Sequence, residues 1–381
     1  MIFSGERIRQ AREITGLTQI ELAEAVGVNQ STIARLESDG FDEPENAYLQ
    51  AIALRTTFPL TFFKQGRPPE FALGSLLFRK RKSLDRDDKA RIRQTARLAF
   101  ELVEKLARSR QPDIQVKRFP TKIDPVKAAI VTRDNLGLSP DTPVYRLMRT
   151  LEKNGVLVLS LPVAIPKYDA FSLWSDGEPR QPLIVLSANK PGDRVRFSLS
   201  HELAHLLMHH PVTVGSAVVE EEANHFAAEF LLPAEAMKRE LLLPITLTHL
   251  AQLKARWGVS MQALIMRALA LNLITVRQTK RLFMMLSAKG WRTAEPVSIP
   301  AEKPRRLRKL AEAIYGPAPE IQELASLVHA PAKLVRQIVD CHAGRDDFPS
   351  SSRTTPTPPP RGPVPSKVID FQARRYGRRS K

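Results

Sequence analysis

The chain has 381 residues, 43% of them hydrophobic, and 58 Lys and Arg against 40 Asp and Glu give a formal net charge of +18. This length allows more than one buried core, and the charge favours a polyanionic partner, although basic residues spread over a surface would give the same total. A single cysteine excludes an internal disulfide framework, and without a signal core or a long apolar run we expect a cytoplasmic protein with no membrane segment.

The first predicted elements are two short helices near the amino terminus. Residues 18–21 form a capping box, which predicts a helix from Gln19 to about Val26. After the turn at Gly27, Asn29 can cap a second helix over residues 30–37. The helical period leaves three polar side chains of this second helix pointing outward: Gln30, Ser31 and Arg35.

This stretch resembles the Xre-type helix-turn-helix of phage-like repressors over about residues 4 to 65, through the run T-Q-I-E-L-A-E-A-V-G-V-N-Q-S-T-I-A-R-L-E. The resemblance implies that double-stranded operator DNA is a partner, with Gln19 at a phosphate and Gln30, Ser31 and Arg35 in the major groove. It also makes a homodimer on paired half-sites the default expectation. The alternative is a small helical bundle that binds protein instead.

A basic amphipathic helix is predicted next, within the run from Phe78 to Arg108. We interpret it as a solvated connecting helix, because charge runs on long helices usually face water. The alternative is an extension of the DNA-binding surface. Three β-rich runs follow, at residues 155–161, 170–174 and 182–187, and predict a small sheet. An edge strand of this sheet is a candidate for pairing with an extended peptide.

The run after these strands, R-F-S-L-S-H-E-L-A-H-L-L-M-H-H, contains an H-E-x-x-H pattern. Residues i and i+4 share one face of a helix, so His201 and His205 can bind one Zn²⁺ ion while Glu202 lies beside them as catalytic general base. The flanking leucines predict a buried helix, where these polar side chains would be costly without a metal or partners. Manganese or iron could use the same donors.

A third donor is sought in E-E-E-A-N-H-F-A-A-E-F-L-L-P. Glu220 is the predicted ligand, because its helical face also carries small residues that let another helix approach closely. Glu222 is the second choice, and Glu221 is expected in solvent. Asn224, one turn after Glu220, is predicted to hold a ligand by a hydrogen bond. The other histidines here are expected to cap the helix or to face solvent: His209, His210 and His225.

These two motifs resemble the ImmA/IrrE family of metallopeptidases over about residues 151 to 273. The resemblance implies a gluzincin-like site in which His201, His205 and Glu220 bind the metal and Glu202 is the catalytic acid/base. It also implies a cytoplasmic protease that cleaves a repressor protein. The substrate itself is left open.

The predicted fold class is mainly α with a small β-sheet (α+β), in which a five-helix helix-turn-helix domain precedes a zincin-like metallopeptidase domain. The expected boundaries are residues 1–70 for the DNA-binding domain, 71–120 for a basic helical linker and 121–300 for the peptidase. Residues 301–345 should form a C-terminal helical segment, and 346–381 a disordered, Pro-rich, basic tail.

The sequence therefore predicts a DNA-binding transcriptional regulator with a zinc-dependent endopeptidase that cleaves a repressor or antitoxin-like protein. Two alternatives stay open. One is a transcription factor whose metal site is structural or sensory, and the other is an antitoxin component without proteolysis. Glu202 discriminates the peptidase from the first alternative, because a structural zinc site does not need this carboxylate. The second alternative would show as binding to a neighbouring gene product without proteolysis.

Overall fold

The computed structural model describes residues 3–38, 46–70, 84–108, 113–165, 168–176, 180–209 and 217–343. The predicted tail at 346–381 and the basic residues 78–83 lie outside these ranges. In the described part of the chain, no helix is both long and apolar enough to cross a membrane.

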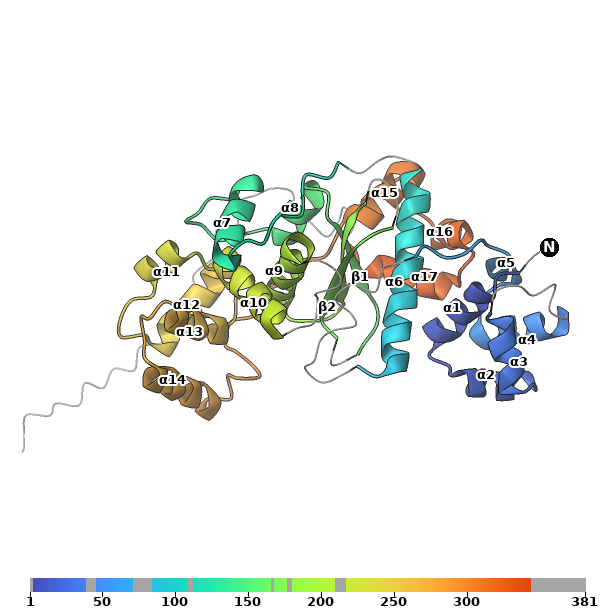
Figure 1. The fold of residues 1–381 in the computed structure, drawn as a ribbon, viewed down its shortest axis with the longest axis horizontal. Helices are drawn as coiled ribbons and strands as arrows, with labels where there is room; N and C mark the ends of the chain where they lie inside the picture. Colours follow the sequence, from blue (N-terminus) through green and yellow to red (C-terminus); the bar gives the residue numbers. More distant parts are fainter. Residues whose placement is uncertain are drawn as a thin grey trace, which may run out of the picture. The chain divides into compact units, whose positions relative to one another are not determined.

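The amino-terminal region is a group of five short helices, as the sequence predicted (Figure 1). Their bounds are α1 Gly5–Thr15, α2 Gln19–Val26, α3 Gln30–Leu36, α4 Asn46–Thr56 and α5 Leu60–Phe63. The capping box at Thr18 and Glu21 forms in full. Asn29 does occupy the position before α3, but its side chain makes no capping hydrogen bond. The local capping signal therefore sets the start of α2, whereas the cap predicted for α3 does not form.

The next elements are α6 Arg86–Ala107, α7 Pro125–Asn135, α8 Leu147–Lys153, β1 Leu157–Leu161, β2 Ala170–Trp174 and β3 Pro182–Ser187. The strands form one sheet in the order β1-β3-β2, with β1 parallel and β2 antiparallel to β3. β1 begins two residues later than predicted because Gly155 has φ +89°, and a Cβ there would lie 2.5 Å from the backbone oxygen of Asp113.

The rest of the described chain is helical. The helices are α9 Gly192–Met208, α10 Ala217–Leu231, α11 Ala234–Glu240, α12 Leu247–Trp257, α13 Met261–Ala270, α14 Val276–Ala288, α15 Arg306–Tyr315, α16 Ile321–Val328 and α17 Ala332–Asp340. The structure is thus mainly helical with one small sheet, and the predicted fold class is confirmed.

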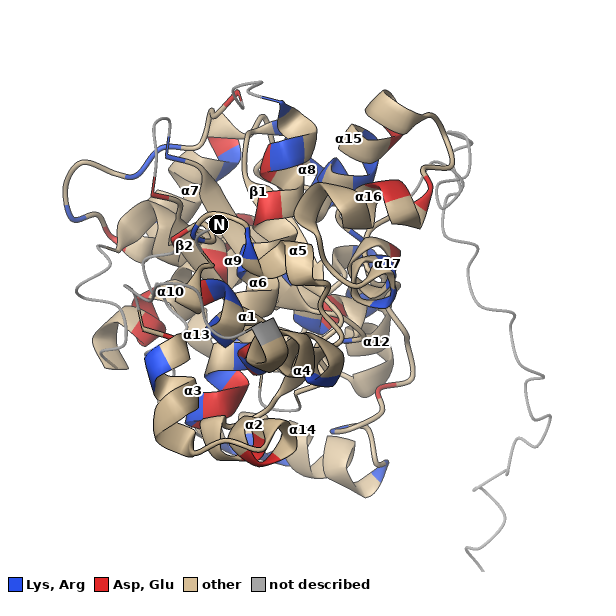
Figure 2. Ribbon diagram, turned by 90° about the vertical axis from the view of Figure 1, so that its right-hand side faces the viewer, with Lys and Arg blue, Asp and Glu red and all other residues tan. Residues whose placement is uncertain are grey.

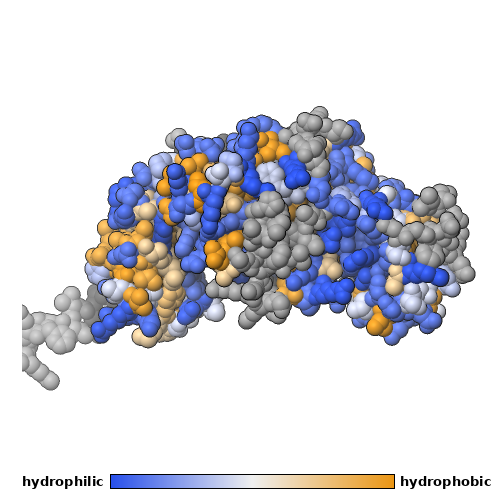
Figure 3. Space-filling view, viewed as in Figure 1, coloured by the Kyte–Doolittle hydropathy of each residue, from blue (hydrophilic) through white to orange (hydrophobic). Residues whose placement is uncertain are grey.

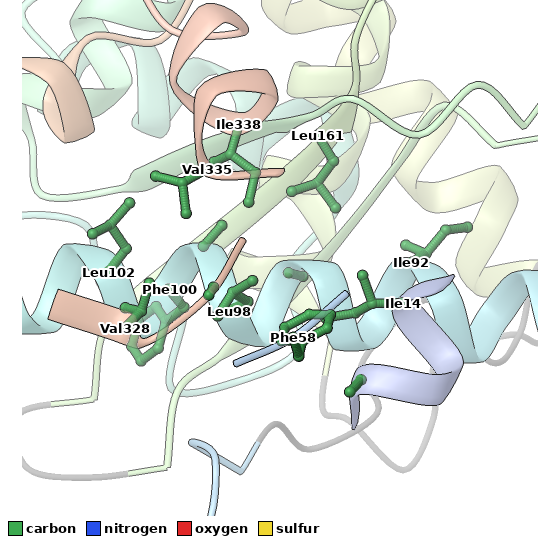
Figure 4. Packing of buried hydrophobic residues seen from close by; sticks show 14 of the residues in the cluster. Ile14, Phe58, Ile92, Leu98, Phe100, Leu102, Leu161, Val328, Val335 and Ile338 are labelled. Atoms are coloured by element: carbon green, nitrogen blue, oxygen red, sulfur yellow. The ribbon is translucent and has the colours of Figure 1, made fainter. Parts of the chain in front are cut away.

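The sheet divides two hydrophobic cores. Side chains of β1 alternate between them: Leu157 and Leu159 pack with α6 and the C-terminal helices, whereas Val158 packs with α9 and α10. In Figure 4, apolar side chains of α6 converge with Leu161 from β1 and with Val335 and Ile338 from α17. The buried His342, just after α17, accepts a hydrogen bond from the backbone N–H of Ser160 in β1.

The prediction of a solvated linker helix is wrong for α6. Twelve of its 22 residues are buried, and it lies between the amino-terminal helices and the sheet (Figure 1). Two charged residues in its second half are also out of water, since Glu101 and Arg97 are 6% and 4% exposed. Glu101 accepts two hydrogen bonds from Arg7 of α1, at 2.7 and 3.0 Å. Helix α6 is therefore part of the core that carries the amino-terminal helices.

Candidate metal centre and DNA-reading face

Helix α9 carries the H-E-x-x-H pattern against the sheet. It begins after Pro191, and its leucines at 199, 203, 206 and 207 are all buried in the second core. Trp174 of β2 donates a hydrogen bond from its Nε1 to the backbone oxygen of Leu206, at 3.0 Å, near the end of the helix. The apolar face of α9 thus fixes the direction in which its polar face points.

Two imidazoles and one carboxylate meet between α9 and α10. The Nε2 atoms of His201 and His205 are 3.1 Å apart. Glu220 of α10 brings its Oε2 to 3.5 Å from His201 Nε2 and its Oε1 to 3.4 Å from His205 Nε2. Burial alone would raise the pKa of the Glu220 carboxyl, but its contacts with the two histidines lower that pKa well below the ordinary value. The three predicted ligands therefore lie together between α9 and α10.

The donor set fits a zinc ion. Zinc binds imidazole nitrogen and carboxylate oxygen at about 2.0–2.1 Å, and a tetrahedron with such bonds has donor-to-donor edges of about 3.3 Å. The two imidazole nitrogens are 3.1 Å apart, and each lies 3.4 or 3.5 Å from a different oxygen of Glu220, so all three distances are close to that edge. Three protein donors also leave the fourth position that a catalytic site needs.

Small side chains bring α10 this close to α9. Ala223 and Ala227 are fully buried on the α10 face that also carries Glu220, as the sequence suggested. Glu221 points to solvent, with its side chain 72% exposed. Glu222, the second choice for a ligand, lies with His209 instead, at 3.2 Å. The rotation of α10 thus selects Glu220 over its two neighbours.

Both histidines of the cluster have a hydrogen-bonding partner at Nδ1. Asn224 lies with its Oδ1 3.0 Å from Nδ1 of His201, which is the contact predicted for it. Nδ1 of His205 is 2.9 Å from Nδ1 of His209. A metal on Nε2 of each ring requires a proton on Nδ1, and in both cases an acceptor is within reach.

His209 is the supporting residue that sequence reasoning missed. It ends α9 as its C-cap, yet its ring is 5% exposed rather than in solvent. Burial lowers the pKa of His209 to about 4, and Glu222 at its Nε2 opposes that effect. The signal was the spacing of His201, His205 and His209, each four residues from the next on one helical face. His225 is exposed as expected, and His210 lies outside the described residues.

Glu202 is completely buried and faces the edge strand of the sheet. Its Oε2 accepts a hydrogen bond of 2.8 Å from the Ser172 hydroxyl in β2. β2 pairs with β3 on one side, and within the described ranges no strand pairs with its other side. Ser172, also missed from the sequence, fixes the rotation of the carboxylate beside the two histidines.

The predicted DNA-reading residues lie on the surface of α2 and α3. Gln30, Ser31 and Arg35 are exposed, while Ile33 behind them is completely buried. Gln30 donates a hydrogen bond of 2.7 Å to the side-chain oxygen of Gln19, whose own amide donates to Glu37 at 2.7 Å. Both basic and acidic residues occur in α1 and around α3 (Figure 2). The two glutamines thus present a linked pair of amides at the amino ends of α2 and α3.

Comparison with known families matches two separate segments of the chain. Residues 8–63 match the helix-turn-helix model, and residues 151–269 match the peptidase M78 model, described as an IrrE N-terminal-like domain. The chain joins a helix-turn-helix domain to an IrrE-like peptidase domain. A search of curated proteins found no match.

The IrrE-like domain includes every residue of the candidate metal centre, and the helix-turn-helix domain includes every predicted DNA contact. Helix α6 and the C-terminal helices α15 to α17 lie outside both matched ranges. These elements pack on the opposite face of the peptidase sheet from α9, and α6 also packs on α1 of the helix-turn-helix domain. The family matches alone therefore do not define the core that joins the two domains.

Proposed function

We propose that the protein is a DNA-binding transcriptional regulator whose IrrE-like domain is a zinc-dependent endopeptidase. The observation that carries the proposal is the convergence of His201, His205 and Glu220 within bonding distance of one small cation, with the buried carboxylate of Glu202 next to them in α9. The substrate proposed is a protein, either a repressor or an antitoxin-like protein. The proposed compartment is the cytoplasm, where the DNA partner would be.

Each side chain of the metal centre has a proposed role in peptide hydrolysis. Zinc, when bound by the three donors, would polarise a peptide carbonyl and make a water molecule more acidic. Glu202 would accept the proton of the attacking water on its carboxylate and return it to the leaving amine. Ser172 would keep that carboxylate in one rotamer by donating to its Oε2. The outer edge of β2 would pair with the substrate backbone as an added strand.

The DNA-binding half of the proposal uses the exposed side chains of α2 and α3. Gln19 would contact a phosphate, and Gln30, Ser31 and Arg35 would read base edges in the major groove. Binding as a homodimer to paired half-sites of an operator would follow from this mode of docking. The proposed domain limits are those expected from the sequence, except that α6 belongs to the folded core.

The decisive variant is Glu202→Gln, with Glu221→Gln as matched control, because Glu221 is an exposed carboxylate on the neighbouring helix. Glu202→Gln should retain one equivalent of zinc by elemental analysis and lose cleavage, while Glu221→Gln keeps both. Suitable substrates are proteins encoded by neighbouring genes and a quenched-fluorescence peptide library.

If Glu202→Gln cleaves as well as the parent, the endopeptidase proposal fails. A zinc-loaded parent that cleaves nothing but still represses its operator would favour a second function, a transcription factor with a structural or sensory metal. Binding of a neighbouring gene product without cleavage would instead favour an antitoxin component.

A further inference from the structure

A cleft of about 820 Å³ lies between the helix-turn-helix domain and the amino-terminal turns of α6. One wall contains Gln19 and Gln30, the amide pair at the amino ends of α2 and α3. The opposite wall contains Arg86, Lys89 and Arg93 of α6. Basic side chains that are distant in sequence therefore line the same cleft as two of the proposed DNA contacts.

Buried polar contacts fix these two walls relative to each other. Arg7 of α1 forms a bidentate ion pair with Glu101 of α6, and both side chains are at most 7% exposed. Gln94 of α6 donates a hydrogen bond of 2.8 Å to Glu13 of α1. Because such pairs are costly to break, they hold the helix-turn-helix domain against α6.

The charges of the cleft are unequal. On the α1 side, Arg9 is paired with Glu13 at 2.8 Å and is neutralised there. On the α6 side, Arg86 and Lys89 form no ion pair with any residue that the structure describes. The Nε of Arg93 is buried without a hydrogen-bond partner, and one carboxylate, Asp87, lines the same wall. Among the described residues, the α6 wall thus offers three cations against one anion.

We infer that the amino-terminal turns of α6 form a second phosphate-contacting element, which holds the backbone of the duplex read by α3. This inference rests on the proposed DNA-binding function. A duplex whose major groove receives α3 carries phosphates along both edges of that groove, and the α2 wall supplies only neutral amides. Arg86 and Lys89 supply the positive charge that these amides lack, at a position fixed by the Arg7–Glu101 pair.

The test measures how salt weakens binding. Each phosphate neutralised by a protein cation contributes about −0.9 to the slope of log K against log salt concentration for duplex DNA. The full-length protein is titrated with a mixed-sequence duplex of about 25 base pairs over a series of KCl concentrations. The test variant is Arg86→Gln with Lys89→Gln. The matched control is Arg277→Gln with Lys280→Gln, which removes the same charge from two exposed residues of α14.

The α6 variant should bind the duplex more weakly and lose up to about 2 from the magnitude of the slope, whereas the control keeps the parental slope. Asp87→Asn, which removes the only carboxylate that the described residues of α6 contribute to that wall, should strengthen binding. An unchanged slope in the α6 variant, or tighter binding, overturns the inference. It is also overturned if the variant keeps its DNA affinity and loses substrate cleavage, since the cleft would then serve the protein substrate. A parent that binds no duplex at all rejects the DNA-binding function itself.

Discussion

Replacing His209 with Leu tests whether the residues behind the metal ligands control zinc affinity. When His205 binds a metal through Nε2, its Nδ1 carries a proton, and the acceptor of that proton is Nδ1 of His209 at 2.9 Å. His209 must then have its own proton on Nε2, which faces Glu222 at 3.2 Å. The pair therefore stabilises one tautomer of His205, the one that can bind zinc.

The expected loss can be worked from burial. The side chain of His205 is 2% exposed, so without His209 its Nδ1–H has no access to water and no acceptor. A buried donor left without a partner costs about 1–3 kcal/mol. The metal-free protein avoids much of this cost, because the proton of His205 can move from Nδ1 to Nε2. Zinc affinity should therefore fall on the order of 10- to 100-fold, as is typical when an outer hydrogen bond of a metal ligand is lost.

The assay is competition for zinc against a chromophoric chelator at fixed pH. His225→Leu is the control, because it removes a histidine whose side chain is 60% exposed on α10. His209→Gln offers an amide oxygen as acceptor and should recover most of the affinity. Thermal melts establish that each variant folds. If folded His209→Leu binds zinc as tightly as the parent, the tautomer argument is refuted.

Three further predictions concern stability and recognition. Burial raises the pKa of Glu152 to about 7 from 4.5, so the native protein holds this proton more tightly than the unfolded chain does. This contribution to the free energy of unfolding is full below about pH 4.5 and is lost as the pH rises through 7, by about 3 kcal/mol at most. Urea unfolding of Glu152→Gln should lack this pH dependence. Parallel pH profiles of the variant and the parent would contradict the prediction. Glu101→Ala leaves the buried Arg7 without its ion-pair partner and should lower the free energy of unfolding by about 3–5 kcal/mol; a loss under about 1 kcal/mol would mean that the domains are not joined there. Arg35→Ala should cost about 1–3 kcal/mol of operator binding and relax base preference at one position, and a uniform loss across sequences would assign Arg35 to a phosphate instead.

Local sequence signals were sufficient wherever the physics is local. The capping box at Thr18 sets the start of α2, because its hydrogen bonds join residues three positions apart. The same holds for His201 and His205, since any helix brings positions i and i+4 together. Strands β2 and β3 also have the predicted limits, as their apolar runs end at turn-forming residues.

The burial of α6 could not be read from its composition. Its charged residues predicted a helix in water, but Glu101 and Arg97 are neutralised by partners about ninety residues away in sequence. The rule that charges face solvent fails when another element supplies the opposite charge. Likewise, the C-terminal helices were predicted as helices but not as the cover of the sheet face opposite α9, because amphipathicity shows that a face is apolar and not what packs on it.

The sequence by itself determined which residue types could bind a metal and which short helices carry them, because both depend on spacing within one turn. Only the tertiary structure decided that Glu220 rather than Glu222 joins the two histidines, that His209 contacts His205 and Ser172 contacts Glu202, and that α6 lies beside the proposed DNA-reading face. Each of these depends on how one helix is rotated against another. That rotation is set by packing between residues far apart in the chain, which no local pattern encodes.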